Sequence, residues 1–217
     1  MTLYSYCLRY DDGAAPNPYW GTCTLTICKP AIRRSAQVGD WVVGLGSANS
    51  PMGDVSRSVV YAMRITQKMS LKEYDQFCRK SLKNKIPNWR HRDFRRRVGD
   101  CIYDYSLGLP PRMREGVHGP GNRQRDLSGK FALLSTHFYY FGDHPIPLPD
   151  SLASIAHRTQ GHKSVANDAF FDPFVHWIEG SGYEPDLLVG EPQLKPQLIL
   201  EQDIRGKCSP HDPEEDE

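Results

Sequence analysis

Short segments that mix apolar and polar residues occupy most of the first 70 positions of the chain. Residues 2–10, 21–30, 39–48 and 58–67 are rich in β-branched or aromatic side chains and are bounded by turn-forming residues, a pattern typical of strands. Residues 31–36 predict a short helical turn between the second and third segments. Ser70 and Glu73 form the capping-box signature of a helix over residues 71–82. This part of the chain therefore predicts four strands and one helix.

The middle of the chain has little periodicity. Residues 83–130 are rich in Arg, Gly, Pro and Asn, which predicts long loops. Residues 130–143 predict a further strand, and helical patterning returns in residues 151–158 and 172–180. We expect one α+β domain over residues 1–200, built as a small curved sheet or barrel with flanking helices and a basic, loop-rich insertion at residues 79–130. Residues 201–217 are acidic and poor in apolar side chains, which predicts a disordered tail.

Composition is that of a soluble globular protein. Hydrophobic residues make up 39% of the 217 residues and charged residues 24%, which is enough apolar material for a core. No apolar stretch approaches the roughly 20 residues of a membrane helix, and the N-terminus lacks a secretory pattern. The six cysteines include no CxxC pair, so reduced thiols and a cytoplasmic location are expected.

The net charge of +1 conceals a separation of charge along the chain. Residues 79–130 hold 14 basic and 5 acidic side chains, whereas residues 200–217 hold 2 basic and 7 acidic ones. Such asymmetry favours an anionic partner. Aromatic residues alternate with cations between positions 83 and 97, which suits single-stranded or distorted nucleic acid, although a solvated basic face is the alternative. The candidate phosphate-binding residues, with the first two expected to be exposed, are Arg33, Arg34, Arg90, Arg92, Arg95, Arg96 and Arg97.

Several common sites are not supported by the sequence. Gly44 and Gly46 follow a predicted strand but lack the third small residue and the helix of a dinucleotide fingerprint, so a turn or bulge is expected there. Cys23 and Cys28 are five apart on a predicted strand, which sends them to opposite faces. Both are interpreted as small core residues rather than as metal ligands or nucleophiles. We expect no metal and no cofactor.

Aromatic residues near predicted strand ends form the second candidate site. Trp20 and Trp41 lie near Asn17 and Asn49 in the expected loops, and rings combined with amides can hold a flipped or modified base. The alternative is that the rings fill the core, and for Trp41 both interpretations stay open.

Several runs of residues resemble known families. GDWVVGLGSANSP at residues 39–51 and SVVYAMRITQKMSLKEYD at residues 58–75 resemble the strand pair of the PUA-like superfamily, which includes ASCH, EVE and YTH domains. Together with YCLRYDDGAAPNPYWG at residues 6–21, GDCIYDY at 99–105, FYYFGD at 138–143 and GHKS at 161–164, they resemble more closely the nucleotide modification associated domain family, over residues 3–180. The resemblance implies a role around modified nucleobases in phage or bacterial DNA-modification systems, and it carries no catalytic assignment.

Three hypotheses follow. The first is binding of a modified or flipped base, a nucleotide or nucleic acid. PUA-like relatives accept a base in an aromatic-lined pocket, which here implies Trp20, Trp41 and residues 46–49. The full set of candidate base or nucleotide contacts is Asn17, Trp20, Lys29, Trp41, Gly46, Ser47 and Asn49.

The second hypothesis is an enzyme acting on a nucleotide or on a base within DNA. Its candidate acid–base residues are Asp104, His137, His157 and His162, and Lys29 would contact phosphate or act as an electrophile. The third is a non-catalytic subunit that docks on an acidic protein partner of a DNA-modification system. DNA, RNA and free nucleotide all remain open as ligands.

Overall fold

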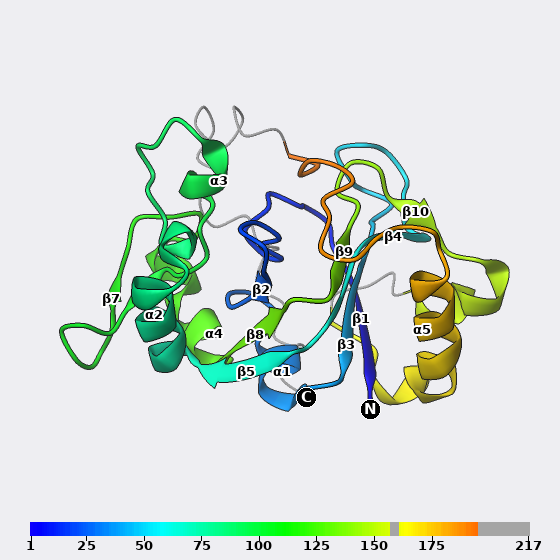
Figure 1. Ribbon diagram of the computed structural model, residues 1–217, viewed down its shortest axis with the longest axis horizontal. Helices are drawn as coiled ribbons and strands as arrows, with labels where there is room; N and C mark the ends of the chain where they lie inside the picture. The colour runs from blue at the N-terminus through cyan, green and yellow to red at the C-terminus, as the bar shows by residue number, and fades with distance from the viewer. Residues whose placement is uncertain (157–160, 195–217) are drawn as a thin grey trace.

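The main sheet runs through the centre of the molecule. In the computed structural model, which describes residues 1–156 and 161–194, this sheet has the order β1 (Leu3–Cys7), β3 (Trp41–Leu45), β4 (Ser58–Arg64) and β10 (Ile146–Pro147). β9 (Phe138–Tyr140) also pairs with β4 (Figure 1). β1 runs parallel to β3, and the other pairs are antiparallel. The predicted strands at residues 2–10, 39–48 and 58–67 are confirmed.

Both faces of this sheet are buried. Alternation along the strands sends Leu3, Trp41 and Val43 to one face, where they pack against α5 (Phe171–Glu179). The short 3-10 helices η3 (Asp150–Ile155) and η4 (Val165–Phe170) lie on the same side of the sheet as α5 (Figure 1). The opposite face carries Tyr4 and Val42, which pack against β2 (Cys23–Leu25) and α1 (Pro30–Ser35). The sheet is therefore the middle layer of the fold.

A second, three-stranded sheet lies beside the first. It has the order β2 (Cys23–Leu25), β8 (Phe131–Ser135) and β5 (Gln67–Ser70), all antiparallel. The prediction of one strand over residues 130–143 is wrong, because this run divides into β8 and β9, which belong to different sheets. Ser135 Oγ donates to the carbonyl oxygens of Arg64 and His137, at 2.6 and 2.7 Å, and thereby fixes the bend between the two strands.

The helix after the fourth predicted strand is confirmed. α2 (Leu71–Lys80) begins with the expected capping box. Ser70 Oγ accepts from the Glu73 amide at 3.2 Å, and the Ser70 amide donates to Glu73 Oε2 at 2.7 Å. The short helical turn predicted at residues 31–36 is α1 (Pro30–Ser35).

The basic region is more ordered than its sequence pattern indicates. It contains η1 (Lys83–Lys85), α3 (Phe94–Arg97), β6 (Tyr103–Asp104), β7 (Arg112–Met113), η2 (Pro120–Asn122) and α4 (Arg123–Ser128). Lys85 is fully buried, and its ammonium donates to the carbonyl oxygens of Asn17 and Thr22, both at 2.7 Å. This buried cation ties the insertion to the loop between β1 and β2.

The α+β class is confirmed. Within the described residues the sheets do not close into a barrel, and the PUA-like arrangement and the domain boundary at residue 200 stay predictions. The predicted tail at residues 201–217 lies outside the described residues. In the described part of the chain, no helix is long and apolar enough to cross a membrane.

Candidate functional site

A small pocket opens where the end of β1 meets the turn between β2 and α1. Its cavity volume is about 60 Å³, and the buried segment around Val117 and His118 closes it on one side. Its lining residues come from four segments of the chain. They are Tyr6, Cys7, Leu8, Arg9, Tyr10, Asp12, Ala14, Ala15, Ile27, Cys28, Lys29, Val117, His118, Arg125 and Leu194.

Cys28 lies at a sharp turn between a strand and a helix. Its φ is 57° and that of Lys29 is 38°, so two consecutive residues with side chains adopt the left-handed region. Pro30 then begins α1, whose first turn does not need its missing N–H. The Cys28 amide donates to Asp126 Oδ1 at 2.9 Å, which holds this turn against α4.

A histidine–carboxylate pair lies directly behind the Cys28 thiol. Cys28 Sγ is 3.4 Å from His118 Nε2, and His118 Nδ1 is 2.6 Å from Asp126 Oδ2. The Tyr103 hydroxyl also donates to Asp126 Oδ2, at 2.9 Å. Thiol, imidazole and carboxylate therefore form one continuous chain of polar contacts that ends at the pocket.

Electrostatics in this group favour a protonated imidazole. Burial acts to lower the pKa of His118, but the electrostatic interaction with Cys28 and the hydrogen bond to Asp126 outweigh it, so the pKa lies well above its ordinary value. Burial acts to raise the pKa of Asp126, yet the hydrogen bond and charge of His118 hold it below the ordinary range. His118 and Asp126 therefore stabilise each other's charged forms.

Arg33 fixes the backbone on both sides of this group. It is fully buried, so the prediction of an exposed phosphate-binding residue is wrong. Its guanidinium donates to the carbonyl oxygens of Cys28 at 2.7 Å, Asp126 at 2.6 Å and Phe131 at 2.9 Å. Burial lowers its pKa to about 10. A buried arginine needs several fixed acceptors, and here one lies on the neighbouring Cys28 turn and two lie more than 90 residues further along the chain.

Cations surround the pocket. Arg9, Lys29 and Arg125 contribute to its lining, against one carboxylate, that of Asp12. The Lys29 ammonium lies 4.7 Å from the centre of the Tyr6 ring. Burial raises the pKa of Asp12, partly offset by the hydrogen bond from the Ala14 amide. The excess of positive charge favours an anionic ligand.

Of the seven predicted base contacts, Lys29 alone lines this pocket. Trp41 is 1% exposed and packs against Tyr139 and Phe174 in the core, so its interpretation as an open base-stacking ring is wrong and the core alternative holds. Asn17 is fully buried and binds the Lys85 ammonium and the Val98 carbonyl oxygen. Neither side chain is available to a ligand in this conformation.

The remaining predicted base contacts lie elsewhere. Trp20 is half-buried, and the Arg95 guanidinium lies 5.2 Å from its ring centre. The pairing of β3 with β4 shifts register between Gly44 and Leu45, as the bulge prediction expects. Glycine is required at position 44, because a Cβ there would collide with the Tyr61 ring. The Gly46 amide donates to the Ser58 carbonyl oxygen at the start of β4, and the Ser47 carbonyl oxygen accepts from the Ser50 and Val55 amides in the turn that precedes β4. Asn49 is exposed in that turn.

The three predicted acid–base residues that the structure describes contact different partners. Asp104 pairs with Arg79 and Arg114, and the hydrogen bond from Ser106 is the main cause that lowers its pKa to about 2. His137 lies against Trp41 and 3.4 Å from Glu179, whereas the His162 ring is tilted by 37° to the Tyr4 ring, with 5.9 Å between the ring centres. His157 lies outside the described residues.

His118 and Asp126 are not among the residues predicted from the sequence, and Cys28 was interpreted there as a core residue. Both missed residues lie in the irregular insertion, eight positions apart, and no pattern links them to Cys28. One signal in the sequence could have pointed to Cys28 as a site residue. It directly precedes Lys29 and Pro30, at the junction of a strand and a helix. A nucleophile on a strained strand–turn–helix junction is a recurrent arrangement.

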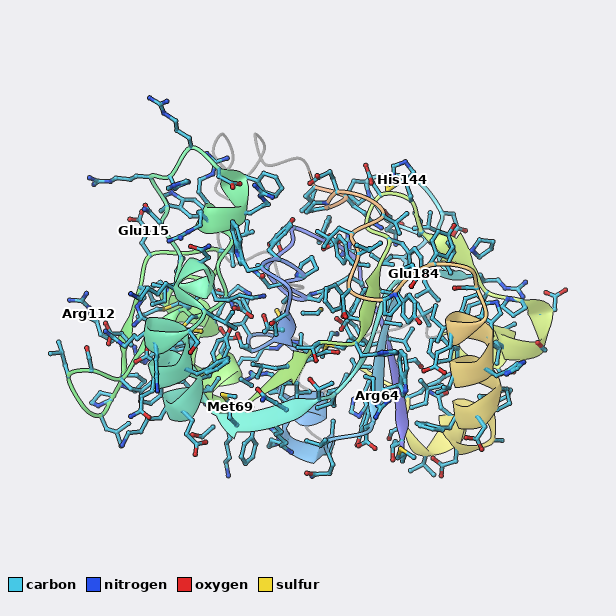
Figure 2. All side chains as sticks on the ribbon, in the orientation of Figure 1. Arg64, Met69, Arg112, Glu115, His144 and Glu184 are labelled. Atoms are coloured by element: carbon cyan, nitrogen blue, oxygen red, sulfur yellow. The ribbon has the colours of Figure 1, made fainter. Side chains whose placement is uncertain are left out.

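A wide basic groove forms a second feature of the surface. It has a volume of about 850 Å³ and its lining includes Lys83, Arg90, Arg96 and Arg112. Arg96 binds the Asn84 side chain, whereas no described carboxylate is within ion-pair distance of Lys83, Arg90 or Arg112. Arg112 and Glu115 lie on the side of the molecule opposite α5 (Figure 2).

Other predicted phosphate contacts lie near this region or on α1. Arg92 and Arg95 are exposed, and Arg95 forms an ion pair with Asp93 at 2.7 Å. Arg97 is half-buried and donates to the His91 carbonyl oxygen. Arg34 is half-buried and donates to the Ser128 carbonyl oxygen at 3.2 Å.

Fold and pocket together define an α+β protein with a cation-rimmed pocket, in which a thiol faces a buried imidazole–carboxylate pair. The chain belongs to the family described as nucleotide modification associated domain 2, whose family model matches residues 1–197. This confirms the family resemblance and places the chain in the context of nucleotide-modification systems. No curated protein and no solved structure matches the chain significantly.

Proposed function

We propose that this protein binds a nucleotide in the pocket at the end of β1, as part of a nucleotide-modification system. The observation that carries the proposal is the gathering of Arg9, Lys29 and Arg125 around one small cavity. A cavity of about 60 Å³ has room for a group the size of a phosphate or one edge of a base, so the rest of the ligand lies at its mouth. Cations hold phosphate oxygens through charge-assisted hydrogen bonds.

Calorimetric titration with deoxynucleoside and ribonucleoside monophosphates tests this proposal. Lys29→Gln removes one cation from the lining, and we expect it to weaken binding about tenfold, the loss of one charged hydrogen bond. Lys72→Gln on the exposed side of α2 is the matched control, and it leaves the affinity unchanged. Equal affinities for wild type and Lys29→Gln, or no binding of any nucleotide, would contradict the proposal.

A second candidate function is binding of single-stranded nucleic acid along the basic groove. The specific observation is the three cations, Lys83, Arg90 and Arg112, which have no described carboxylate within ion-pair distance and outnumber Glu115, the carboxylate of the same lining. Half-buried Trp89 in the same lining offers a ring on which a base can stack. Cations that bind phosphates release the counterions of the nucleic acid, so the affinity for nucleic acid falls as the salt concentration rises.

Fluorescence anisotropy with a labelled single-stranded oligonucleotide measures that dependence. Each phosphate contact contributes about 0.7 to the slope of log affinity against log salt. We expect replacement of Lys83, Arg90 and Arg112 by Gln to reduce the slope by about 2. The control variant replaces Arg57, Arg64 and Lys72 by Gln, which removes three positive charges outside the groove. We expect it to keep the salt slope of the wild type. A wild-type affinity that is identical at low and moderate salt would exclude the groove as a nucleic-acid site.

A further inference from the structure

Nucleotide binding leaves one feature of the pocket unexplained. Cys28 Sγ, His118 Nε2, His118 Nδ1 and Asp126 Oδ2 follow one another in a line, with separations of 3.4 Å at the thiol and 2.6 Å at the carboxylate. A histidine that served the core alone would be satisfied by the carboxylate and by a backbone group. Here its second nitrogen faces a thiol that lines a cavity.

The supporting contacts hold this line in place. Asp126 accepts from the Cys28 amide and from the Tyr103 hydroxyl, both at 2.9 Å, so its carboxylate has little freedom to rotate. Arg33 binds the carbonyl oxygens of both Cys28 and Asp126. Cys28 and Asp126 are thus both held by one buried guanidinium. Precise placement by neighbouring groups is what catalytic constellations require.

Another cysteine in the same pocket shows what distinguishes Cys28. Cys7 also lines the cavity and is also half-buried, but its thiol contacts the Gly46 carbonyl oxygen at 3.8 Å. Cys23 is buried away from the cavity, and burial raises its pKa to about 12. Among the cysteines that the structure describes, Cys28 combines access to the pocket with a facing imidazole.

We propose that Cys28 is a catalytic nucleophile for acyl transfer, with His118 as its acid–base partner and Asp126 as a positioning residue that orients His118. The substrate class is an ester or amide of a phosphorylated compound. The preference for a phosphorylated substrate rests on the proposed nucleotide binding, whereas the reactivity of Cys28 does not.

The steps balance without an oxidant or a reductant. Cys28 Sγ bonds to the carbonyl carbon of the donor while the thiol proton lies on His118 Nε2. The bond from that carbon to its leaving oxygen or nitrogen breaks, and the leaving atom takes the proton from His118. Water, or an amine of an acceptor nucleotide, then attacks the thioester carbon. It gives a proton to His118, which returns the proton to Sγ as the carbon–sulfur bond breaks.

The first test uses the wild-type chain and compares its two pocket thiols. The protein is treated with limiting iodoacetamide at pH 6.5, and alkylation of the Cys7 and Cys28 peptides is followed by mass spectrometry. We expect Cys28 to react at least about tenfold faster, because a facing imidazole raises its thiolate fraction. A smaller ratio overturns the proposal, and this result does not depend on whether any variant folds.

The second test detects the acyl intermediate. With p-nitrophenyl acetate we expect a burst of nitrophenol and one acetyl group on the Cys28 peptide. Cys28→Ser abolishes both, and Cys7→Ser retains both. Acetylation that is distributed equally over the two cysteines overturns the proposal. His118→Gln removes the burst, and Asp126→Asn shifts its pH profile, a readout that a purely structural role of Asp126 would not move.

Nucleotide titration of Cys28→Ser separates this inference from the function on which its substrate class rests. A variant that binds nucleotide but forms no acyl adduct supports both proposals. If Cys28 is acylated but the protein binds no nucleotide, the catalytic proposal is supported and the proposed nucleotide binding is overturned. An unreactive Cys28 in a protein that binds nucleotide overturns the catalytic proposal alone.

Discussion

Arg33 shows how one side chain organises the pocket without lining it. Its guanidinium reaches three carbonyl oxygens on the Cys28 turn, on α4 and at the start of β8. Gly129 lies against the guanidinium so closely that any Cβ there would collide with it. The planar guanidinium of Arg33 therefore fits this position both in its shape and in the directions of its N–H groups.

Arg33→Lys tests this role at the residue scale. A lysine ammonium cannot span all three acceptors, so buried carbonyl groups lose their partners, and we expect the unfolding free energy to fall by about 3 kcal/mol. Arg34→Lys is the matched control on the same helix, since Arg34 is half-buried and binds only the Ser128 residue. Urea denaturation measures both variants. Equal stabilities for the two would show that the three hydrogen bonds contribute little.

Residue types alone did not separate surface from core in this chain. Trp41 and Asn17 have chemistry suited to base recognition, and Arg33 has chemistry suited to phosphate, yet all three are buried. The decisive partners, such as Lys85 for Asn17, lie far along the chain. Lys29 does line a pocket, on a turn formed by local residues, and its contact with a base or nucleotide stays a prediction.

At the scale of elements, local patterns were reliable where local contacts form the element. The capping box of α2 and the strands β1, β3 and β4 follow from their own sequences. The split of residues 130–143 into β8 and β9 depends on pairing with two different sheets, which periodicity cannot reveal. The same limit applies to α4, a short helix whose importance lies in carrying Asp126 to the Cys28 turn.

At the scale of the whole molecule, the basic residues of the insertion do not all lie on the surface. Lys85 is one of the 14 basic residues counted over residues 79–130, yet it is buried and binds carbonyl oxygens of the interior. Arg33, which lies outside that segment, is buried in the same way. The cations left for a partner are those of the basic groove and of the pocket rim. Net charge by segment therefore supports the proposed anionic ligand but overstates the number of cations available to it.

Asp11 connects the global stability of the molecule to pH. Its carboxylate is buried and accepts from the Tyr140 hydroxyl at 2.7 Å and from the Gly13 amide at 3.1 Å, so it attaches the loop after β1 to β9. Burial is the main cause that raises its pKa to about 7, although the Tyr140 hydrogen bond acts in the opposite direction. In the unfolded chain an aspartate has a pKa of about 3.9.

This difference predicts that stability falls as pH rises. Between about pH 4 and 7 the folded state keeps a proton on Asp11 that the unfolded chain releases, so each added pH unit favours unfolding by up to about 1.4 kcal/mol. Asp11→Asn stays neutral and removes this contribution. We expect the unfolding free energy of wild type, relative to Asp11→Asn, to drop by about 2 kcal/mol from pH 5 to pH 7.5 in urea titrations. Asp150→Asn, which removes an exposed carboxylate, serves as the control. A constant difference between wild type and Asp11→Asn across this range would mean that Asp11 is already ionised at pH 5 in the folded protein.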